Sequence, residues 1–314
     1  MTLMLITIGI LLAVFAASFV VEALRRRPVT PAKLYWAPDL PIQYTQIDGN
    51  RIRYIKTGSG PTLVLLHTLR TQLDIFEKVV PTLAKSFTVY APDYPGHGFS
   101  DIPKTDYEPE LFVKAVEGFL DKLDLTDVTL AGISIGGVIP LIIAAKQNPR
   151  VTKVIAINPY DYGDGTGLAR ANIFAWLTVH VGKIPVLGEA FMRLRNADVE
   201  ARILRGAVVN PSAINPGFAD QANASGRRPE HYQAFLNLLR HAHLWDAARE
   251  HYGDIKVPVL VVYGERDWSR PDERRRTVAA IPNAKMETLP EGGHFLSLDQ
   301  PKRLADLIAS FAKS

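Results

Sequence analysis

Apolar runs alternate with amphipathic stretches along most of the chain, and this alternation predicts the secondary structure. Short apolar runs bounded by turn-forming residues are typical of strands, whereas longer stretches with apolar residues three or four apart are typical of helices. We expect eight strands, over residues 42–47, 51–56, 62–67, 87–92, 128–132, 154–158, 257–263 and 284–289. We expect helices over residues 73–85, 109–123, 135–147, 271–281 and 300–312. This order predicts an α/β fold with a mostly parallel sheet, whose first two strands form an antiparallel hairpin through Asp48-Gly49-Asn50.

The segment between the sixth and seventh expected strands is far longer than a crossover connection requires. Between about residues 160 and 250 it carries aromatic and aliphatic residues at loosely helical spacing. We expect several amphipathic helices there, which form a cap over the mouth of a site. Most of their apolar side chains would pack against the sheet. Some, with Trp176 and Phe235 as candidates for substrate contact, would line a mainly apolar cleft.

Residues 1–21 carry no charged side chain, and Arg25-Arg26-Arg27 follows soon after. A helix of this length reaches roughly 30 Å, enough to cross a bilayer core. We therefore expect a single-pass membrane anchor over residues 1–24, with the lipid bilayer as a partner, then a proline-rich linker over 25–41 and the main domain over 42–314. Because positively charged flanks tend to stay in the cytoplasm, the domain is expected on that side. A cleaved signal peptide and a buried core helix are the alternatives.

The amino-acid composition and the net charge limit which class of protein this is and which partners it can have. The chain has 314 residues, of which 47% are hydrophobic and 22% charged, enough for one large α/β domain. It contains no cysteine, which excludes a thiol nucleophile, structural disulfides and thiolate metal sites. The net charge is +4, and the arginine clusters lack interleaved aromatic residues, so we expect a small-molecule substrate and no nucleic acid as partner. The oligomeric state is left open.

The most informative motif is the turn from Gly132 to Gly136, which follows an expected strand and precedes an expected helix. A strand-to-helix turn this tight needs residues almost free of side chain two before and two after its centre, and glycine meets that need at both positions. The turn raises the hydroxyl of Ser134 out of the sheet. The helix that follows directs its positive end, with the Ile135 N–H, toward a developing oxyanion. Ser134 is therefore the predicted nucleophile.

Candidates for the other two members of a catalytic triad follow downstream. Asp267 comes just after the seventh expected strand, and His294 lies in a glycine-flanked loop after the eighth. A serine hydroxyl needs a base to remove its proton, and the base needs a carboxylate to fix its tautomer and stabilise its charged form. We therefore expect His294 as the base and Asp267 as the acid. Asp161 or Asp164, after the sixth strand, is the alternative acid.

The order Ser, Asp, His and two further segments resemble the α/β-hydrolase superfamily. The run from Leu63 to His67 is similar to the strand that enters the family's oxyanion loop, and the run from Asp93 to Ser100 matches its D-x-x-G-x-G-x-S turn. The resemblance covers roughly residues 40–314 and lies with the capped serine hydrolases, which include esterases, lipases and C–C bond hydrolases. It implies an eight-stranded, mostly parallel sheet with helices on both faces and a helical cap.

The resemblance also implies a second oxyanion donor in the loop after His67. The family usually has glycine there, whereas this chain has Thr68. Since threonine adopts a positive φ only at a cost, we expect a loop of different shape, with the N–H of Leu69 or Thr68 as the donor. Arg70, in the same loop, would either hold a substrate carboxylate or pair with an acidic side chain and brace the loop.

These residues predict a serine hydrolase that cleaves carboxylic esters with an apolar acyl or alcohol part through an acyl-enzyme. The mechanism needs no cofactor or metal, and the cap histidines His241, His243 and His251 lack a convincing carboxylate partner. Haloalkane dehalogenases and epoxide hydrolases on this fold use an aspartate nucleophile, so a serine at residue 134 argues against both. A C–C bond hydrolase, a lactonase or a perhydrolase would use the same triad. A non-catalytic ligand-binding protein is a further alternative.

Overall fold

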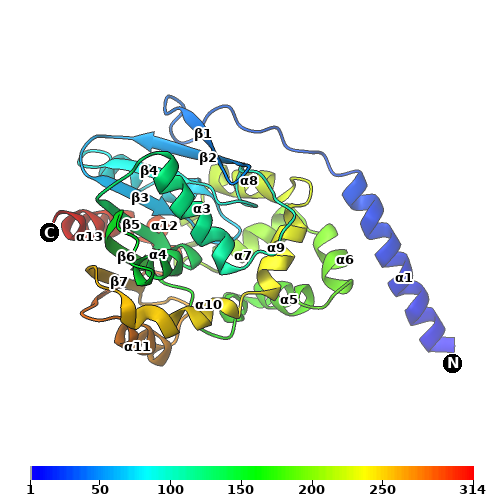
Figure 1. The fold of residues 1–314 in the computed structure, drawn as a ribbon. Coiled ribbons are helices and arrows are strands. Elements are labelled where there is room, and N and C mark those ends of the chain that lie inside the picture. The colour runs from blue at the N-terminus through cyan, green and yellow to red at the C-terminus, as the bar shows by residue number, and fades with distance from the viewer. Residues whose placement is uncertain (1) are drawn as a thin grey trace.

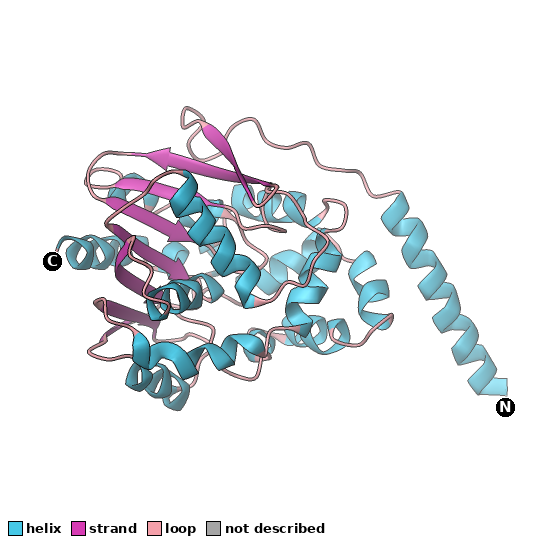
Figure 2. Ribbon diagram, in the orientation of Figure 1, coloured by secondary structure: helices cyan, strands magenta, loops and turns pink. Residues whose placement is uncertain are grey.

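The computed structural model of the protein describes residues 2–314, and eight strands of this part form one sheet (Figure 2). They are β1 (Ile42–Ile47), β2 (Asn50–Thr57), β3 (Thr62–Leu66), β4 (Thr88–Pro92), β5 (Val128–Ile133), β6 (Val151–Ile157), β7 (Val259–Gly264) and β8 (Lys285–Leu289). The sheet order is β1-β2-β4-β3-β5-β6-β7-β8. β2 pairs antiparallel with both β1 and β4, and the other described pairs are parallel. The predicted α/β fold with an eight-stranded, mostly parallel sheet is confirmed.

Helices cover both faces of the sheet (Figure 1). Those outside the cap are α1 (Thr2–Ala23), η1 (Leu73–Phe76), α2 (Val80–Leu83), α3 (Pro109–Lys122), α4 (Ile135–Ala145), α11 (Pro271–Ala280), α12 (Leu296–Asp299) and α13 (Pro301–Lys313). Between β6 and β7 the chain forms a helical cap. Its elements are η2 (Gly167–Arg170), α5 (Ile173–Gly182), α6 (Leu187–Arg193), α7 (Ala197–Arg205), η3 (Pro211–Ala213), α8 (Pro216–Gly226), α9 (His231–Arg240), α10 (Leu244–Ala247) and η4 (Ala248–Asp254).

Each face of the sheet has its own hydrophobic core, because successive side chains of a strand point to opposite faces. Val64 of β3 belongs to the core that contains Phe112 of α3. Its neighbours Leu63 and Leu65 belong to the other core, with Ile308 of α13. All of these side chains are fully buried. The central strands therefore read as continuous apolar runs, as a parallel sheet covered on both faces requires.

One expected helix differs in the structure. The stretch over residues 73–85 contains two short pieces, η1 and α2, with Glu77, Lys78 and Val79 between them. Pro81 lies in the first turn of α2. Proline has no N–H to donate and is tolerated only near the start of a helix, so a continuous helix cannot run through this position.

The linker before the sheet is attached to the domain near η1. Leu34 is buried, the indole N–H of Trp36 donates to Asp74 Oδ1 at 2.8 Å, and the Tyr35 hydroxyl donates to Glu77. These contacts lead the chain along the domain from α1 to β1 (Figure 1).

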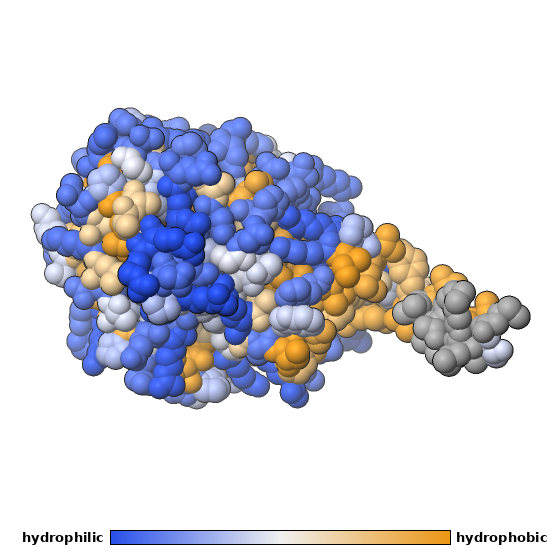
Figure 3. Space-filling model, turned by 90° about the horizontal axis from the view of Figure 1, so that it is seen from below, coloured by the Kyte–Doolittle hydropathy of each residue, from blue (hydrophilic) through white to orange (hydrophobic). Residues whose placement is uncertain are grey.

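The helix α1 lies beside α6 of the cap, at the end of the molecule away from the sheet (Figure 1). Much of its described surface is apolar next to a mostly hydrophilic domain surface (Figure 3), with Leu12 and Val20 among the exposed side chains. The last turns of α1 contact the cap through polar groups. Glu22 forms an ion pair with Arg195 at 2.7 Å, and the Ser18 hydroxyl accepts a hydrogen bond from Arg193.

The prediction of a membrane anchor is wrong. Within residues 2–314, no helix is both long and apolar enough to cross a membrane. This finding corrects the anchor predicted over residues 1–24, of which Met1 lies outside the described part. It also corrects the predicted single-pass topology, the cytoplasmic orientation and the bilayer as a partner. The run over residues 1–21 is uncharged, but Ser18 within it accepts a hydrogen bond from Arg193 of the cap, and Glu22 just after it pairs with Arg195.

Candidate active site

Ser134 occupies a sharp turn between β5 and α4. Its backbone has φ 62° and ψ −121°, a conformation that costs an ordinary residue roughly 1–3 kcal/mol. The turn is possible because Gly132 and Gly136 lie so close to neighbouring backbone atoms that neither position has room for a side chain. A Cβ at Gly132 would approach the Gly136 carbonyl oxygen to 1.9 Å, and one at Gly136 would approach the His67 carbonyl oxygen to 2.3 Å. The Ser134 N–H donates to the Ile157 carbonyl at 2.9 Å, which fixes the turn against β6.

Asp267 follows the end of β7 and contacts the imidazole of His294. The distance from His294 Nδ1 to Asp267 Oδ1 is 2.5 Å, and both side chains are buried. The second carboxylate oxygen accepts hydrogen bonds from the Ser269 N–H, at 2.9 Å, and from the Ser269 hydroxyl. Burial alone would raise the pKa of Asp267, but the neighbouring His294 and the hydrogen bonds from Ser269 hold it below its ordinary value. Asp267 is therefore ionised at neutral pH.

The other ring nitrogen of His294 faces the cavity that Ser134 also lines. Because Nδ1 donates to Asp267, Nε2 is the acceptor in the neutral ring. His294 Nε2 and Ser134 Oγ are both buried, and neither has a hydrogen-bond partner among the described residues. The indole of Trp268 stacks on the imidazole, with ring centroids 3.8 Å apart and planes 13° apart. Trp268 in turn donates from Nε1 to the Gly206 carbonyl of the cap at 3.1 Å.

Asn158, which follows β6, connects the loops that carry Asp267 and His294. Its side-chain amide donates to the carbonyls of Gly293 and His294, at 3.0 and 2.9 Å. Its side-chain oxygen accepts from the Gly264 N–H, at the end of β7, at 2.8 Å. The residue is fully buried and has φ 44°, a backbone conformation that asparagine adopts more readily than most residues.

The two expected oxyanion donors come from different elements. The Ile135 N–H is the first of α4 and has no partner within the helix. In the loop after β3, the Thr68 N–H donates to Thr71 Oγ1 at 3.3 Å, whereas the Leu69 N–H has no partner among the described residues. Leu69 is therefore better placed than Thr68 to supply the second donor. The positive φ in this loop falls on Arg70, at 58°, and not on Thr68.

The loop after β3 is held to the turn that follows β4, through Tyr94 and Asp93. His67 Nδ1 donates to the Thr68 carbonyl at 2.8 Å, and His67 Nε2 accepts from the Tyr94 N–H at 3.0 Å. Burial lowers the pKa of His67 to about 3, so the ring is neutral at physiological pH. At the far end, the Leu73 N–H donates to Asp93 Oδ1 at 2.8 Å. These contacts hold the backbone that carries the Leu69 N–H.

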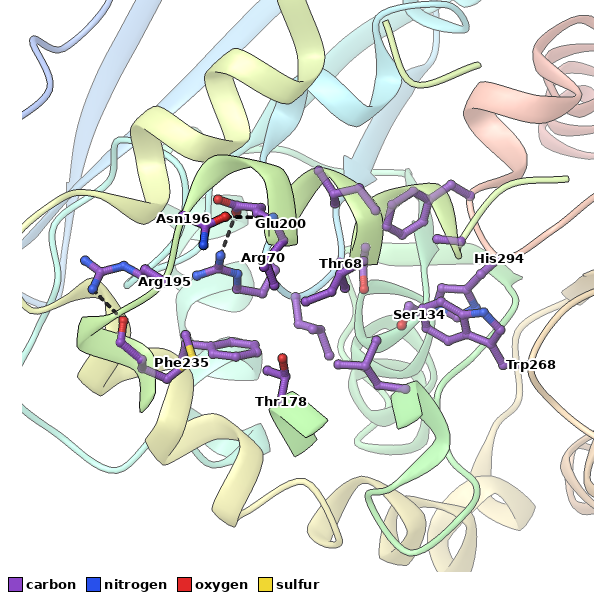
Figure 4. Close-up of a pocket in the computed structure, with 18 of the residues that line it drawn as sticks. Thr68, Arg70, Ser134, Thr178, Arg195, Asn196, Glu200, Phe235, Trp268 and His294 are labelled. Atoms are coloured by element: carbon purple, nitrogen blue, oxygen red, sulfur yellow. Dashed lines mark hydrogen bonds and ion pairs between the residues drawn. The ribbon is translucent and has the colours of Figure 1, made fainter. Parts of the chain in front are cut away.

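A cavity of about 270 Å³ lies between the cap and Ser134. Ser134, His294 and Trp268 lie at one end of it, and Arg70, Glu200 and Asn196 lie at the other (Figure 4). Most of the wall between them is apolar. It includes Leu168, Phe191, Met192, Ile203, Leu204 and Phe295.

The three candidate substrate contacts have different positions. Phe235 lines the cavity, and Arg70 lies over its ring at 4.8 Å from the centroid. Arg70 also forms an ion pair of 2.6 Å with Glu200 of α7, which ties the oxyanion loop to the cap. Trp176 lies outside the cavity. Its side chain is 46% exposed and stacks on His180, one helical turn further along α5.

Neither alternative acid contacts His294, whose Nδ1 is bound by Asp267. Asp161 is fully buried and accepts a hydrogen bond of 2.8 Å from the Thr277 hydroxyl, and Arg249 lies 4.0 Å away. Burial raises the pKa of Asp161 to about 7, although Thr277 and Arg249 oppose the shift. Asp164 is exposed. Across residues 2–314, the cap histidines included, no group of three or more His, Asp or Glu side chains could hold a metal ion.

Sequence reasoning missed Asn158, Trp268, Ser269 and Glu200. Asn158 closes the sixth expected strand, and a polar residue at the carboxyl end of a parallel strand is a known signal for a site. Trp268 and Ser269 directly follow Asp267 in the sequence, so their proximity to the acid could have been inferred. Glu200 gave no signal, because only the packing of α7 over the oxyanion loop brings it to Arg70.

Comparisons with known proteins agree with this architecture. "Haloalkane dehalogenase 2" from Mycobacterium tuberculosis is 30% identical over 264 residues, which cover 82% of this chain and 90% of that protein. The structure of Cfl2 from Burkholderia cenocepacia is similar, with a TM-score of 0.78 and 22% identity over 90% of this chain and 99% of that one. The enol-lactonase from Burkholderia xenovorans LB400 has a TM-score of 0.69 and 22% identity, covering 87% of this chain and 100% of that one.

A family model described as "alpha/beta hydrolase fold" matches residues 61–301. Because the matched segment spans well over half of the chain, the protein belongs to the alpha/beta hydrolase family, as the resemblance in its sequence predicted.

Proposed function

We propose that the protein is a serine hydrolase that cleaves carboxylic esters with an apolar acyl or alcohol part. One observation carries the proposal. Ser134 Oγ and His294 Nε2 are both buried without a hydrogen-bond partner among the described residues, and both line the same mainly apolar cavity. An unpaired buried hydroxyl and an unpaired imidazole nitrogen are costly, so their presence at a ligand-sized cavity supports a role in chemistry.

The proposed reaction begins with attack of Ser134 Oγ on the ester carbonyl carbon, while the hydroxyl proton passes to His294 Nε2. Asp267 stabilises the imidazolium, and the N–H groups of Ile135 and Leu69 donate to the oxyanion. When the tetrahedral intermediate collapses, the carbon–oxygen bond to the alcohol breaks and the alcohol takes the proton from His294. Water then attacks the acyl-enzyme with His294 as base, which releases the acid and restores the Ser134 hydroxyl.

The mainly apolar wall supports an ester with an apolar part over a small polar one. The relatives named above include a haloalkane dehalogenase and an enol-lactonase, and other cleavage reactions are possible for the same triad. Dehalogenases on this fold use an aspartate where this chain has Ser134. Experiment distinguishes ester cleavage from lactone cleavage, from C–C bond cleavage and from ligand binding without turnover.

The test compares turnover of p-nitrophenyl esters of increasing acyl length with that of a six-membered lactone and a vinylogous 1,5-diketone. We expect the wild-type chain to prefer the esters, and medium acyl chains over acetyl. Ser134→Ala should lose about 10³-fold or more in kcat. Ser212→Ala, which alters an exposed serine of the cap, serves as the matched control and should retain activity. Preference for the lactone or the diketone, or ester turnover that survives in Ser134→Ala, would refute the proposal.

A further inference from the structure

A second cavity, of about 300 Å³, lies between the end of α1 and the cap, apart from the one that holds Ser134. Its charged lining is mostly basic. It comprises Arg25, Arg27, Arg193 and Arg227, with Glu22 and Glu230. None of these side chains takes part in the proposed hydrolysis.

The two glutamates are engaged with other cations. Glu22 Oε2 is 2.9 Å from Arg25 Nε and 2.7 Å from Arg195 Nη1. Glu230 is exposed and lies 3.8 Å from Lys104 Nζ. Of the four arginines in the lining, Arg25 is therefore the one that the carboxylates of the cavity neutralise.

The other three arginines have no carboxylate within 4.0 Å among the described residues. Arg193 is the most informative, because its side chain is only 8% exposed. It donates at 3.3 Å to two neutral hydroxyls, those of Tyr232 and Ser18, and lies 3.8 Å from the ring centroid of Phe19. Arg227 Nε is buried without a hydrogen-bond partner. A buried cation without a counter-charge is costly, so the lining of this cavity favours an anion.

We propose that this cavity binds a small anion that carries a phosphate group. Guanidinium groups donate pairs of parallel hydrogen bonds to phosphate oxygens, and a doubly charged group neutralises two of the three unpaired arginines, whereas a carboxylate neutralises one. The ligand is either free phosphate or the phosphate end of a monoester. Since the segment after α1 supplies Arg27 and the cap supplies Arg193 and Arg227, the anion joins these two parts of the chain.

Calorimetric titration of the full chain with inorganic phosphate tests the proposal. We expect saturable binding of one phosphate per chain, weakened about tenfold or more in Arg227→Gln and in Arg27→Gln. Arg275→Gln removes an exposed arginine of α11 and is the matched control, which should bind as the wild type does. Circular dichroism verifies the fold of each variant. Because Arg27 is exposed, its replacement by glutamine removes a charge from the cavity without altering the packed core.

Parallel titrations with monobutyl phosphate and with butyrate identify the source of the anion. Tighter binding of monobutyl phosphate supports a monoester as the ligand, and tighter binding of inorganic phosphate supports the free ion. Three results would overturn the proposal. These are no saturable phosphate binding, equal loss in Arg275→Gln and Arg227→Gln, or butyrate binding tighter than both phosphates.

Discussion

The side-chain amide of Asn158 donates a hydrogen bond of 2.9 Å to the backbone carbonyl of His294. The same amide donates to Gly293, and its oxygen accepts from the N–H of Gly264. One buried side chain thus joins the end of β6, the end of β7 and the loop that carries the proposed base. The position of the imidazole relative to Ser134 depends on this contact.

Replacing Asn158 by aspartate should lower kcat, because a carboxylate oxygen would face two carbonyls where the amide now donates. We expect a fall of about tenfold to hundredfold with a smaller change in KM, since a misplaced catalytic group impairs the chemical step more than binding. The control is Asn148→Asp, which keeps an acceptor for the Arg150 N–H and loses a donor to Glu117 far from the cavity. An unchanged kcat in Asn158→Asp would show that Asn158 does not position the base.

Asp267→Asn should reduce kcat by on the order of 10² to 10⁴, because an amide favours the wrong tautomer of His294. Asp161→Asn should leave kcat near the wild-type value, since Asp161 bonds to Thr277. Steady-state kinetics on one p-nitrophenyl ester measures both. If kcat falls in Asp161→Asn and not in Asp267→Asn, the catalytic acid is Asp161, in the segment after β6.

Asp161 should make stability depend on pH. Its folded pKa is about 7, while that of the unfolded chain is roughly 3.9, so between these values the folded state binds the extra proton. The free energy of unfolding therefore falls as pH rises from about 4 to about 7. In Asp161→Asn the side chain does not titrate, so this fall is absent. The free energy of unfolding of the variant minus that of the wild type should therefore increase between pH 5 and pH 8 by on the order of 1–4 kcal/mol.

Urea unfolding at the two pH values measures this difference. The control is Asp164→Asn, which replaces an exposed carboxylate of the same loop and should follow the wild type at both pH values. Identical pH dependence of the wild type and Asp161→Asn would contradict the assignment of the buried proton to Asp161.

Arg70→Ala should weaken the enzyme equally toward neutral and acidic esters. The ion pair with Glu200 already occupies the guanidinium, so its loss releases the oxyanion loop and leaves a partly buried carboxylate alone. We expect a loss of about 2 kcal/mol in stability and a similar fall in kcat/KM for an alkyl ester and for its carboxylate-bearing analogue. If KM rises only for the acidic ester, Arg70 contacts substrate instead.

Sequence patterns predict the sheet well because its central strands are buried on both faces and flanked by turn residues. Val128 to Gly132 and the glycine-bounded turn at Ser134 are local features, and so is the position of Asp267 at a strand end. The role of Asn158 was inaccessible, since its contact with His294 spans 136 positions in the chain. Trp176 illustrates the same limit, because apolar composition does not reveal which face of the cap helix α5 meets the cavity.

The N-terminal helix shows where composition misleads. Residues 1–21 carry no charged side chain, yet no helix within residues 2–314 is long and apolar enough to cross a membrane, and the end of α1 contacts the cap through Glu22 and Arg195. That ion pair joins residues 173 positions apart, with Arg195 in the segment between α6 and α7. No local pattern encodes such a contact.

Labelling with a fluorophosphonate probe shows whether Ser134 is a nucleophile that His294 activates. Trypsin releases residues 123–146 as one peptide, and Ser134 is its single serine. We expect one adduct per chain, which mass spectrometry locates on this peptide. The adduct should be absent in Ser134→Ala, form much more slowly in His294→Ala and form unchanged in Ser212→Ala. A wild-type chain that takes no label, or an equal adduct in Ser134→Ala, would contradict the role proposed for Ser134.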